Sequence, residues 1–192
     1  MPKFEKDYNE TDYQLIGSQV DGALSSLEKV HRDYDNYVDS SCGVHIHMNA
    51  VDFTFIEIKS LLMIMTKIQP LLYLSLPNDR SKHYCRELKW SMKEVSKIDN
   101  LSQLVSKYYK LENSTFSDEK YNDARYVGTN IHARFMLGSI EFRYHEGTTY
   151  SSDIADWIRF LNSIMSKSTT LSKDNKLYNK IISNKTTPID IV

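Results

Sequence analysis

Residues 139–146, Ser-Ile-Glu-Phe-Arg-Tyr-His-Glu, constrain the fold of this chain more than any other stretch. Apolar and polar side chains alternate along it with a period of two, which is typical of a β-strand with one buried face. The predicted apolar face carries Ile140, Phe142 and Tyr144. The predicted polar face carries Ser139, Glu141, Arg143 and His145. An acid, a guanidinium and an imidazole spaced about 7 Å apart favour the floor of a functional site.

Two other stretches repeat this design. In residues 43–49, the side chains of His45, His47 and Asn49 share a polar face. In residues 129–136, the polar face consists of Asn130, His132 and Arg134. A single strand of this kind is more often a solvated surface, but three in a short chain favour a shared site. The short step through Leu137-Gly138 predicts an antiparallel hairpin in which Gly138 takes a positive φ.

Helical periodicity fills most of the intervening sequence. Helices are expected from an N-cap at Asp21 to about His31, after Asp52, after Asp99 or Asn100, after Asp153, and over residues 174–183. Pro70 is expected to kink or end the second of these helices. Residues 113–122 are polar and are expected to form a mobile loop. The pattern predicts an α+β fold, in which helices pack on the apolar face of a curved antiparallel sheet.

Length and composition exclude several classes of protein. A chain of 192 residues predicts one domain, with a loose arm at 1–12, a core at 13–167 and a C-terminal extension at 168–192. The net charge of −1 and scattered lysines argue against a nucleic-acid partner. Charged residues interrupt the longest apolar run, 56–76, so no membrane span is expected. Two cysteines and no apolar leader predict a reducing, cytoplasmic location.

The motifs together resemble the amidoligase family. The resemblance is carried by Ser-Cys-Gly-Val-His-Ile-His at 41–47, Arg80 with Tyr84-Cys85, Ile-Glu-Phe-Arg and Glu-Gly-Thr within 140–148, and Trp157. It extends from about residue 13 to about residue 165. This family belongs to the carboxylate–amine ligases and implies a glutamine-synthetase-like fold.

The resemblance also implies a chemistry. ATP would activate a carboxylate as an acyl phosphate, an amine would attack it, and Mg²⁺ or Mn²⁺ would neutralise the phosphoryl charge. The implied metal ligands are His45, His47 and Glu141. The implied catalytic and phosphate-binding residues are Glu141, Arg143, Arg134, Arg125 and Asn130, and the implied substrate residues are Arg80 and His145. A competing interpretation makes Glu141 and Arg143 an ion pair on a solvated surface, worth at most about 1 kcal/mol.

One departure from the family leaves the function open. Members usually begin with a Gly-x-Glu-x-Glu strand, but no Glu-x-Glu occurs in this sequence, and Gln14 stands where the family often has an acid. The chain is therefore expected to start after that strand. It would be one half of a split enzyme, whose partner chain covers the open sheet edge, an inactive relative that serves as an interaction or assembly subunit, or a truncated remnant. The high content of Lys, Asn, Ile and Tyr fits a viral source, such as a phage.

Overall fold

The computed structural model describes residues 18–33, 38, 42–74, 76 and 78–183. Its elements, in chain order, are α1 (Ser18–Asp33), β1 (Gly43–Asn49), α2 (Phe55–Leu74), α3 (Asn78–His83), α4 (Met92–Ser96), α5 (Leu101–Leu111), the 3-10 helix η1 (Asp123–Arg125), β2 (Thr129–Asn130), α6 (His132–Leu137), β3 (Ser139–Glu146), α7 (Ser151–Lys173) and α8 (Asn175–Ile182). The loose arm expected at 1–12 lies outside the described residues.

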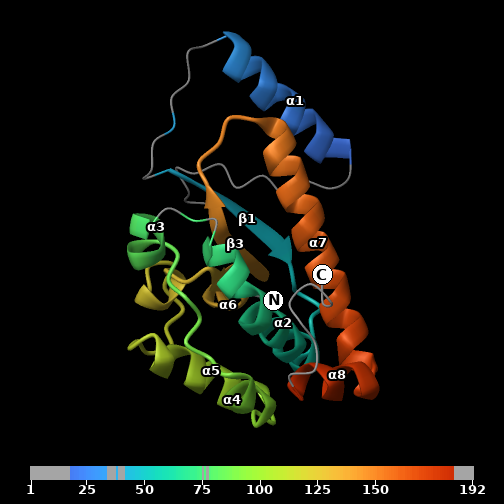
Figure 1. The fold of residues 1–192 in the computed structure, drawn as a ribbon. Helices are drawn as coiled ribbons and strands as arrows, with labels where there is room; N and C mark the ends of the chain where they lie inside the picture. The colour runs from blue at the N-terminus through green and yellow to red at the C-terminus, as the bar shows by residue number, and fades with distance from the viewer. Residues whose placement is uncertain (1–17, 34–37, 39–41, 75, 77, 184–192) are drawn as a thin grey trace.

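The three strands form one antiparallel sheet in the order β1-β3-β2, as expected for an α+β fold. Figure 1 shows β1 beside β3. Ile140 and Phe142 of β3 are fully buried in the hydrophobic core. Ile46 and Met48 of β1 pack against the same core. The alternation predicted from the sequence is therefore confirmed for most of β1 and β3.

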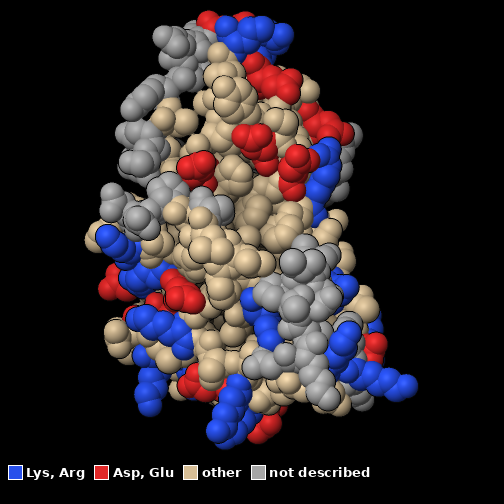
Figure 2. Space-filling model, in the orientation of Figure 1, with Lys and Arg blue, Asp and Glu red and all other residues tan. Residues whose placement is uncertain are grey.

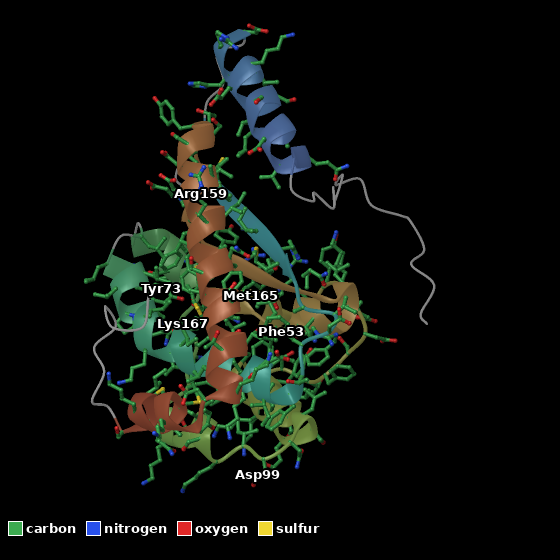
Figure 3. All side chains as sticks on the ribbon, turned by 90° about the vertical axis from the view of Figure 1, so that its right-hand side faces the viewer. Phe53, Tyr73, Asp99, Arg159, Met165 and Lys167 are labelled. Carbon is green, nitrogen blue, oxygen red and sulfur yellow. The ribbon has the colours of Figure 1, made fainter. Side chains whose placement is uncertain are left out.

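Helices α2 and α7 pack against each other and provide a large part of the remaining core (Figures 1 and 3). Residues 58–65 of α2 are all buried, because this helix is apolar on nearly every side. It begins with a reciprocal cap in which Thr54 Oγ1 accepts a hydrogen bond from the Glu57 amide and Glu57 Oε2 accepts one from the Thr54 amide. Thr54, not Asp52, is thus the N-cap. Pro70 lies inside the helix and does not end it.

The C-terminal helices belong to the same packed unit. Helix α7 continues past residue 167 to Lys173, and α8 packs against α7, α2 and α4. Leu171 of α7 and Ile181 of α8 are buried in the core. The helix predicted over 174–183 is confirmed by α8, and no described helix is long and apolar enough to cross a membrane.

The stretch 129–136 differs from its prediction. Only Thr129 and Asn130 pair with β3, and residues 132–137 form the helix α6 instead of a strand. The side-chain oxygen of Asn130 accepts a hydrogen bond from the His132 amide at 2.9 Å, which turns the chain into the helix. Gly138 ends the helix with a φ of 71°. Its positive φ is confirmed, but it caps a helix and does not form a hairpin turn.

Candidate functional site

A polar cluster lies where β1, β3 and β2 run side by side, on the face opposite the core. The register places His47 of β1 directly opposite Glu141 of β3, and Asn130 of β2 opposite Glu141 on the other side. A single row of side chains therefore crosses all three strands. Because cross-strand neighbours have Cβ atoms about 5 Å apart, their polar ends can meet around the Glu141 carboxylate.

The Glu141 carboxylate is the centre of this cluster. Arg143 Nη1 donates a hydrogen bond to Glu141 Oε1 at 2.6 Å, and Asn130 Nδ2 donates one to Glu141 Oε2 at 2.6 Å. The imidazole nitrogens His45 Nδ1 and His47 Nε2 lie 3.3 Å and 3.8 Å from Glu141 Oε1. We define these five residues as the Glu141 cluster.

Burial differs sharply across the Glu141 cluster. Glu141 is 7% exposed and Arg143 is 3% exposed, whereas the side chains of His45 and His47 are each about one-third exposed. The acid and the guanidinium thus form the floor, and the two imidazoles form a surface that a ligand could reach. The solvated ion pair considered as the competing interpretation does not describe this arrangement, because both partners are buried.

The partners of Glu141 determine its protonation. Burial by itself raises the pKa of the Glu141 carboxyl, but the charge of Arg143, the hydrogen bond from Asn130 and the two imidazoles together outweigh it, so that its pKa is lowered. The buried Glu141 is therefore ionised at neutral pH. A charged, oriented carboxylate beneath two accessible imidazoles can bind or orient a polar ligand.

Three neighbours hold the cluster in place. The Tyr84 carbonyl accepts a hydrogen bond from Arg143 Nε at 3.0 Å, and the Arg143 guanidinium carbon lies 5.7 Å from the centre of the Tyr126 ring. Ser139 Oγ and His47 Nδ1 share a hydrogen bond of 2.8 Å. Strand alternation indicated Ser139, and Tyr84 belongs to a motif that carries the family resemblance. Nothing in the sequence indicated Tyr126, because it reaches β3 through a non-local pairing of Arg86 with Val127.

Gly128 directly follows Val127 and lies where the segment around Arg86 comes close to strand β3. A side-chain carbon at Gly128 would collide with the ring of Tyr144, so only glycine fits there without a shift. The Gly128 amide donates to the Arg86 carbonyl, and the Arg143 amide donates to the Gly128 carbonyl, both at 2.9 Å. These bonds connect the segment that carries Tyr84 to the strand that carries Glu141.

Two predicted site residues of α6 lie elsewhere, because residues 131–136 are not a strand. His132 is buried between the Tyr109 hydroxyl, 2.5 Å from its Nδ1, and the Glu119 carbonyl, 2.9 Å from its Nε2, and burial lowers its pKa. Arg134 donates a hydrogen bond from Nη2 to the Val51 carbonyl at 2.6 Å. A helix has a different side-chain period from a strand, so neither residue follows Asn130 toward Glu141.

The structure does not place Arg125 or Arg80 within the Glu141 cluster. The Arg125 guanidinium lies 5.2 Å from the centres of the Tyr121 and Tyr126 rings. It is therefore next to the cluster through Tyr126, on which Arg143 also lies. Arg80 belongs to α3, and its side chain lies outside the described residues. Their phosphate and substrate roles stay predictions.

His145 departs from the polar face because β3 contains a bulge. Val44 pairs with His145 and Ile46 pairs with Phe142, so two residues of β3 lie opposite the single residue His45. The extra residue changes the alternation, and His145 lies on the helix side, where its ring is 5.7 Å from that of Trp157 on α7. The prediction that His145 shares a face with Glu141 is therefore wrong.

The cluster does not fit a divalent cation by itself. Mg²⁺ and similar ions require several oxygen ligands, and both oxygens of Glu141, the one carboxylate in the cluster, already accept short hydrogen bonds. The guanidinium of Arg143 would also repel a cation. In the described part of the chain, no three His, Cys, Asp or Glu side chains are grouped so that they could hold a metal ion.

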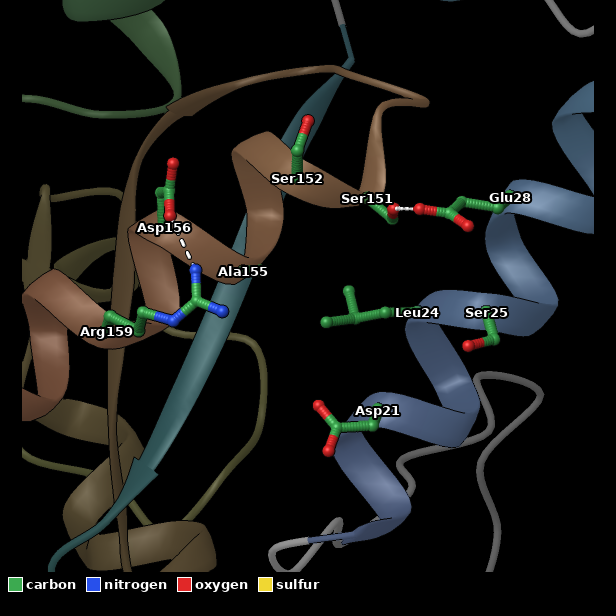
Figure 4. Close-up of a pocket in the computed structure, with 9 residues that line it drawn as sticks. All are labelled: Asp21, Leu24, Ser25, Glu28, Ser151, Ser152, Ala155, Asp156 and Arg159. Carbon is green, nitrogen blue, oxygen red and sulfur yellow. Dashed lines mark hydrogen bonds and ion pairs between the residues drawn. The ribbon is translucent and has the colours of Figure 1, made fainter.

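A separate groove lies between α1 and the first turns of α7, where acidic side chains gather on the face shown in Figure 2. Figure 4 shows two pairs among its polar groups, one across and one along the helices: Ser151 donates to Glu28, and Arg159 Nη1 lies 2.6 Å from Asp156 Oδ1. The Arg159 and Asp156 side chains are about three-quarters exposed. This groove is a solvated contact between helices rather than a second catalytic centre.

The comparisons with known proteins agree with the motifs. The family model described as "Putative amidoligase enzyme" matches residues 19–165, which include all of the Glu141 cluster. No curated protein and no solved structure gave a significant match. The model spans well over half of the chain, and this chain therefore belongs to the amidoligase family.

Proposed function

We propose that this protein takes part in ATP-dependent ligation of a carboxylate to an amine, and that the Glu141 cluster is the part of the site formed by its β-sheet. The observation that carries the proposal is that four motif residues of the matched region, His45, His47, Glu141 and Arg143, meet on the sheet face away from the core. A glutamine-synthetase-like arrangement is part of the same proposal. An antiparallel sheet with helices on one face supports it.

The residues of the cluster would have different roles. Arg143 and Asn130 hold the Glu141 carboxylate ionised and in one orientation through hydrogen bonds of 2.6 Å. His45 and His47 stand at the accessible surface, where an imidazole can donate to an anionic oxygen or accept a proton from an attacking amine. Arg125 lies one tyrosine ring away and would meet nucleotide phosphates. In the described arrangement, Arg143 is buried and its guanidinium is hydrogen-bonded to Glu141, so its main role would be to orient that carboxylate.

Divalent metal is the part of the family chemistry that these residues do not support. A cation would need oxygen ligands beyond the Glu141 cluster. The proposal therefore concerns the binding and orientation of substrates by this chain, and it expects activity to depend on further carboxylates outside the cluster.

A turnover assay tests the proposal. The purified protein is incubated with ATP, Mg²⁺, glutamate and a mixture of amines, and phosphate and amide product are measured. We expect His45→Ala to lower phosphate release by about 10–100-fold, as for other groups that orient ligands, with an unchanged circular dichroism spectrum. Asp156→Asn, an exposed acid of α7, is the matched control. Equal turnover in both variants would contradict the proposal.

A second candidate is an interaction or assembly subunit without turnover. The specific observation in its favour is that both oxygens of Glu141 are occupied by protein donors. Strand β1 lies at one edge of the described three-stranded sheet, where another chain could add a strand. Light scattering and native mass spectrometry on the purified chain separate the two candidates: a complex together with no phosphate release favours the subunit, and phosphate release favours the ligase.

A further inference from the structure

The bulge in β3 creates a second feature on the core side of the sheet. It brings two consecutive residues, Tyr144 and His145, into contact with helices: the Tyr144 ring lies 5.5 Å from that of Tyr73 on α2, and the His145 ring lies 5.7 Å from that of Trp157 on α7. A regular strand would have sent one of them to the opposite face. The bulge therefore places the His145 imidazole at the junction of α2, β3 and α7.

A cavity of about 210 Å³ opens at this junction. Its described lining residues are Leu72, Leu76, Tyr144, His145, Glu146 and Trp157. Sites for drug-sized ligands enclose about 300–1,000 Å³, so this cavity suits a smaller molecule. It is separated from the Glu141 cluster by the sheet, because the lining side chains of Tyr144 and His145 lie on the helix side.

The polar groups of the cavity are complementary to a small zwitterion. The Trp157 indole nitrogen is buried and has no hydrogen-bond acceptor in the part of the chain that the structure describes. A buried donor without a partner is rare and unfavourable, so an oxygen atom from a ligand would remove that cost. Glu146 is exposed and provides a carboxylate at the same cavity.

The His145 imidazole is a further group that can interact with a ligand in this cavity. Its Nδ1 lies 2.8 Å from the Glu146 carbonyl oxygen. A carbonyl can only accept, so Nδ1 carries a proton, and Nε2 of the neutral ring is an acceptor that can meet a donor of the ligand. The two leucines and the indole ring provide apolar walls. The cavity thus combines an indole donor, an imidazole acceptor, one carboxylate and an apolar surface in a small volume.

We propose that this cavity binds a free amino acid with an apolar side chain, such as leucine. The amino acid carboxylate accepts a hydrogen bond from the Trp157 indole, the ammonium group donates to Glu146 and to His145 Nε2, and the side chain contacts Leu72 and Leu76. A simple amine would leave the indole without an acceptor, and a simple acid would leave Glu146 without a cation. This inference does not depend on the ligase proposal, since the cavity lies on the other face of the sheet.

The fluorescence of Trp157 provides a direct test. The chain contains two tryptophans, so Trp90→Phe leaves Trp157 as the only reporter. We expect a saturable fluorescence change with L-leucine. Three comparison ligands each lack one feature: 3-methylbutylamine has no carboxylate, 4-methylpentanoate has no amine, and glycine has no apolar side chain. Each should bind about tenfold more weakly or worse, the factor that follows from losing about 1.4 kcal/mol.

Variants identify the groups responsible. Glu146→Gln should raise the Kd for leucine about tenfold and leave the Kd for 4-methylpentanoate unchanged. Glu119→Gln, another exposed glutamate, should leave both unchanged. If Trp90→Phe does not fold, the ¹⁵N-labelled unsubstituted chain provides the second measurement, in which one of the two indole N–H resonances should move with leucine.

Three results would each overturn the proposal. The first is the absence of a saturable change in fluorescence or indole resonance up to about 10 mM leucine, ten times a Kd of about 1 mM. The second is equal binding of leucine and glycine. The third is leucine binding that Glu146→Gln does not alter. Because none of these readouts uses ATP, failure of the ligase assay and failure of this proposal are distinguishable.

Discussion

Two glutamate–arginine pairs with buried carboxylates have opposite electrostatics in this molecule. In the Glu141 cluster, both carboxylate oxygens accept hydrogen bonds of 2.6 Å. At the end of α5, Glu112 Oε2 lies 3.2 Å from Arg86 Nη2, and Glu112 Oε1 is buried and has no donor among the described residues. The surroundings lower the pKa of Glu141, whereas burial raises the pKa of Glu112 despite the charge of Arg86.

The difference shows that an ion pair alone does not keep a buried carboxylate ionised. Each pair has one arginine, but Glu141 also has the Asn130 amide and two imidazoles near it. Full hydrogen bonding offsets the cost of burying a charge, and partial hydrogen bonding does not. The Glu141 cluster is therefore organised around a negative charge, and the Glu112 pair is not.

The largest expected effect is on folding stability after loss of the Glu141 charge. Glu141→Gln leaves Arg143 buried without its counter-charge, and we expect the free energy of unfolding to fall by about 3–5 kcal/mol. Glu112→Gln is the matched comparison: its partner Arg86 is 30% exposed, so the change should stay within about 1 kcal/mol. Urea unfolding followed by circular dichroism measures both. Similar losses of unfolding free energy in the two variants would contradict the stated difference between the two pairs.

A smaller effect is expected from removing the amide that distinguishes the two pairs. Asn130→Ala deletes the donor to Glu141 Oε2 and the acceptor for the His132 amide, and should lower the free energy of unfolding by about 1–3 kcal/mol. It should also raise the pKa of Glu141, since a hydrogen bond to the charged form is lost.

Asn179→Ala, on the exposed side of α8, is the control for this substitution and should change stability by no more than about 0.5 kcal/mol. An Asn130→Ala protein as stable as the control would mean that the amide does not hold the carboxylate.

The smallest expected effect is in the pH dependence of stability. Glu141 has a folded-state pKa below the ordinary 4.5, so its contribution is present above pH 4.5 and is lost as pH falls through the lowered value. Glu112 has a raised folded-state pKa, so its contribution is present below pH 4.5 and is lost as pH rises through the raised value.

Unfolding free energies measured between about pH 3 and 7 test these opposite signs. Glu141→Gln should flatten the acid limb of the profile, and Glu112→Gln should remove a decline on the higher-pH side. If both substitutions alter the same limb in the same direction, the contrast between the two pairs is wrong.

The sequence by itself determined the features that depend on local periodicity. Alternation with a period of two identified β1 and most of β3, because each residue's face follows from its neighbours along the same strand. It also placed His45, His47, Glu141 and Arg143 on one surface, and the distances around Glu141 agree with that. The helix after Asn100 and the positive φ of Gly138 were also predictable from residues nearby in the sequence.

Other features were decided only by the tertiary structure. Residues 131–136 alternate as a strand would, but the Asn130 side chain starts a helix there and Gly138 ends it. The bulge in β3 moved His145 to the core side, where Trp157 packs on its ring. A bulge is fixed by the partner strand, and the protonation of Glu141 is fixed by groups from β1, β2 and β3. Such contacts join residues distant in sequence, which a local pattern does not contain.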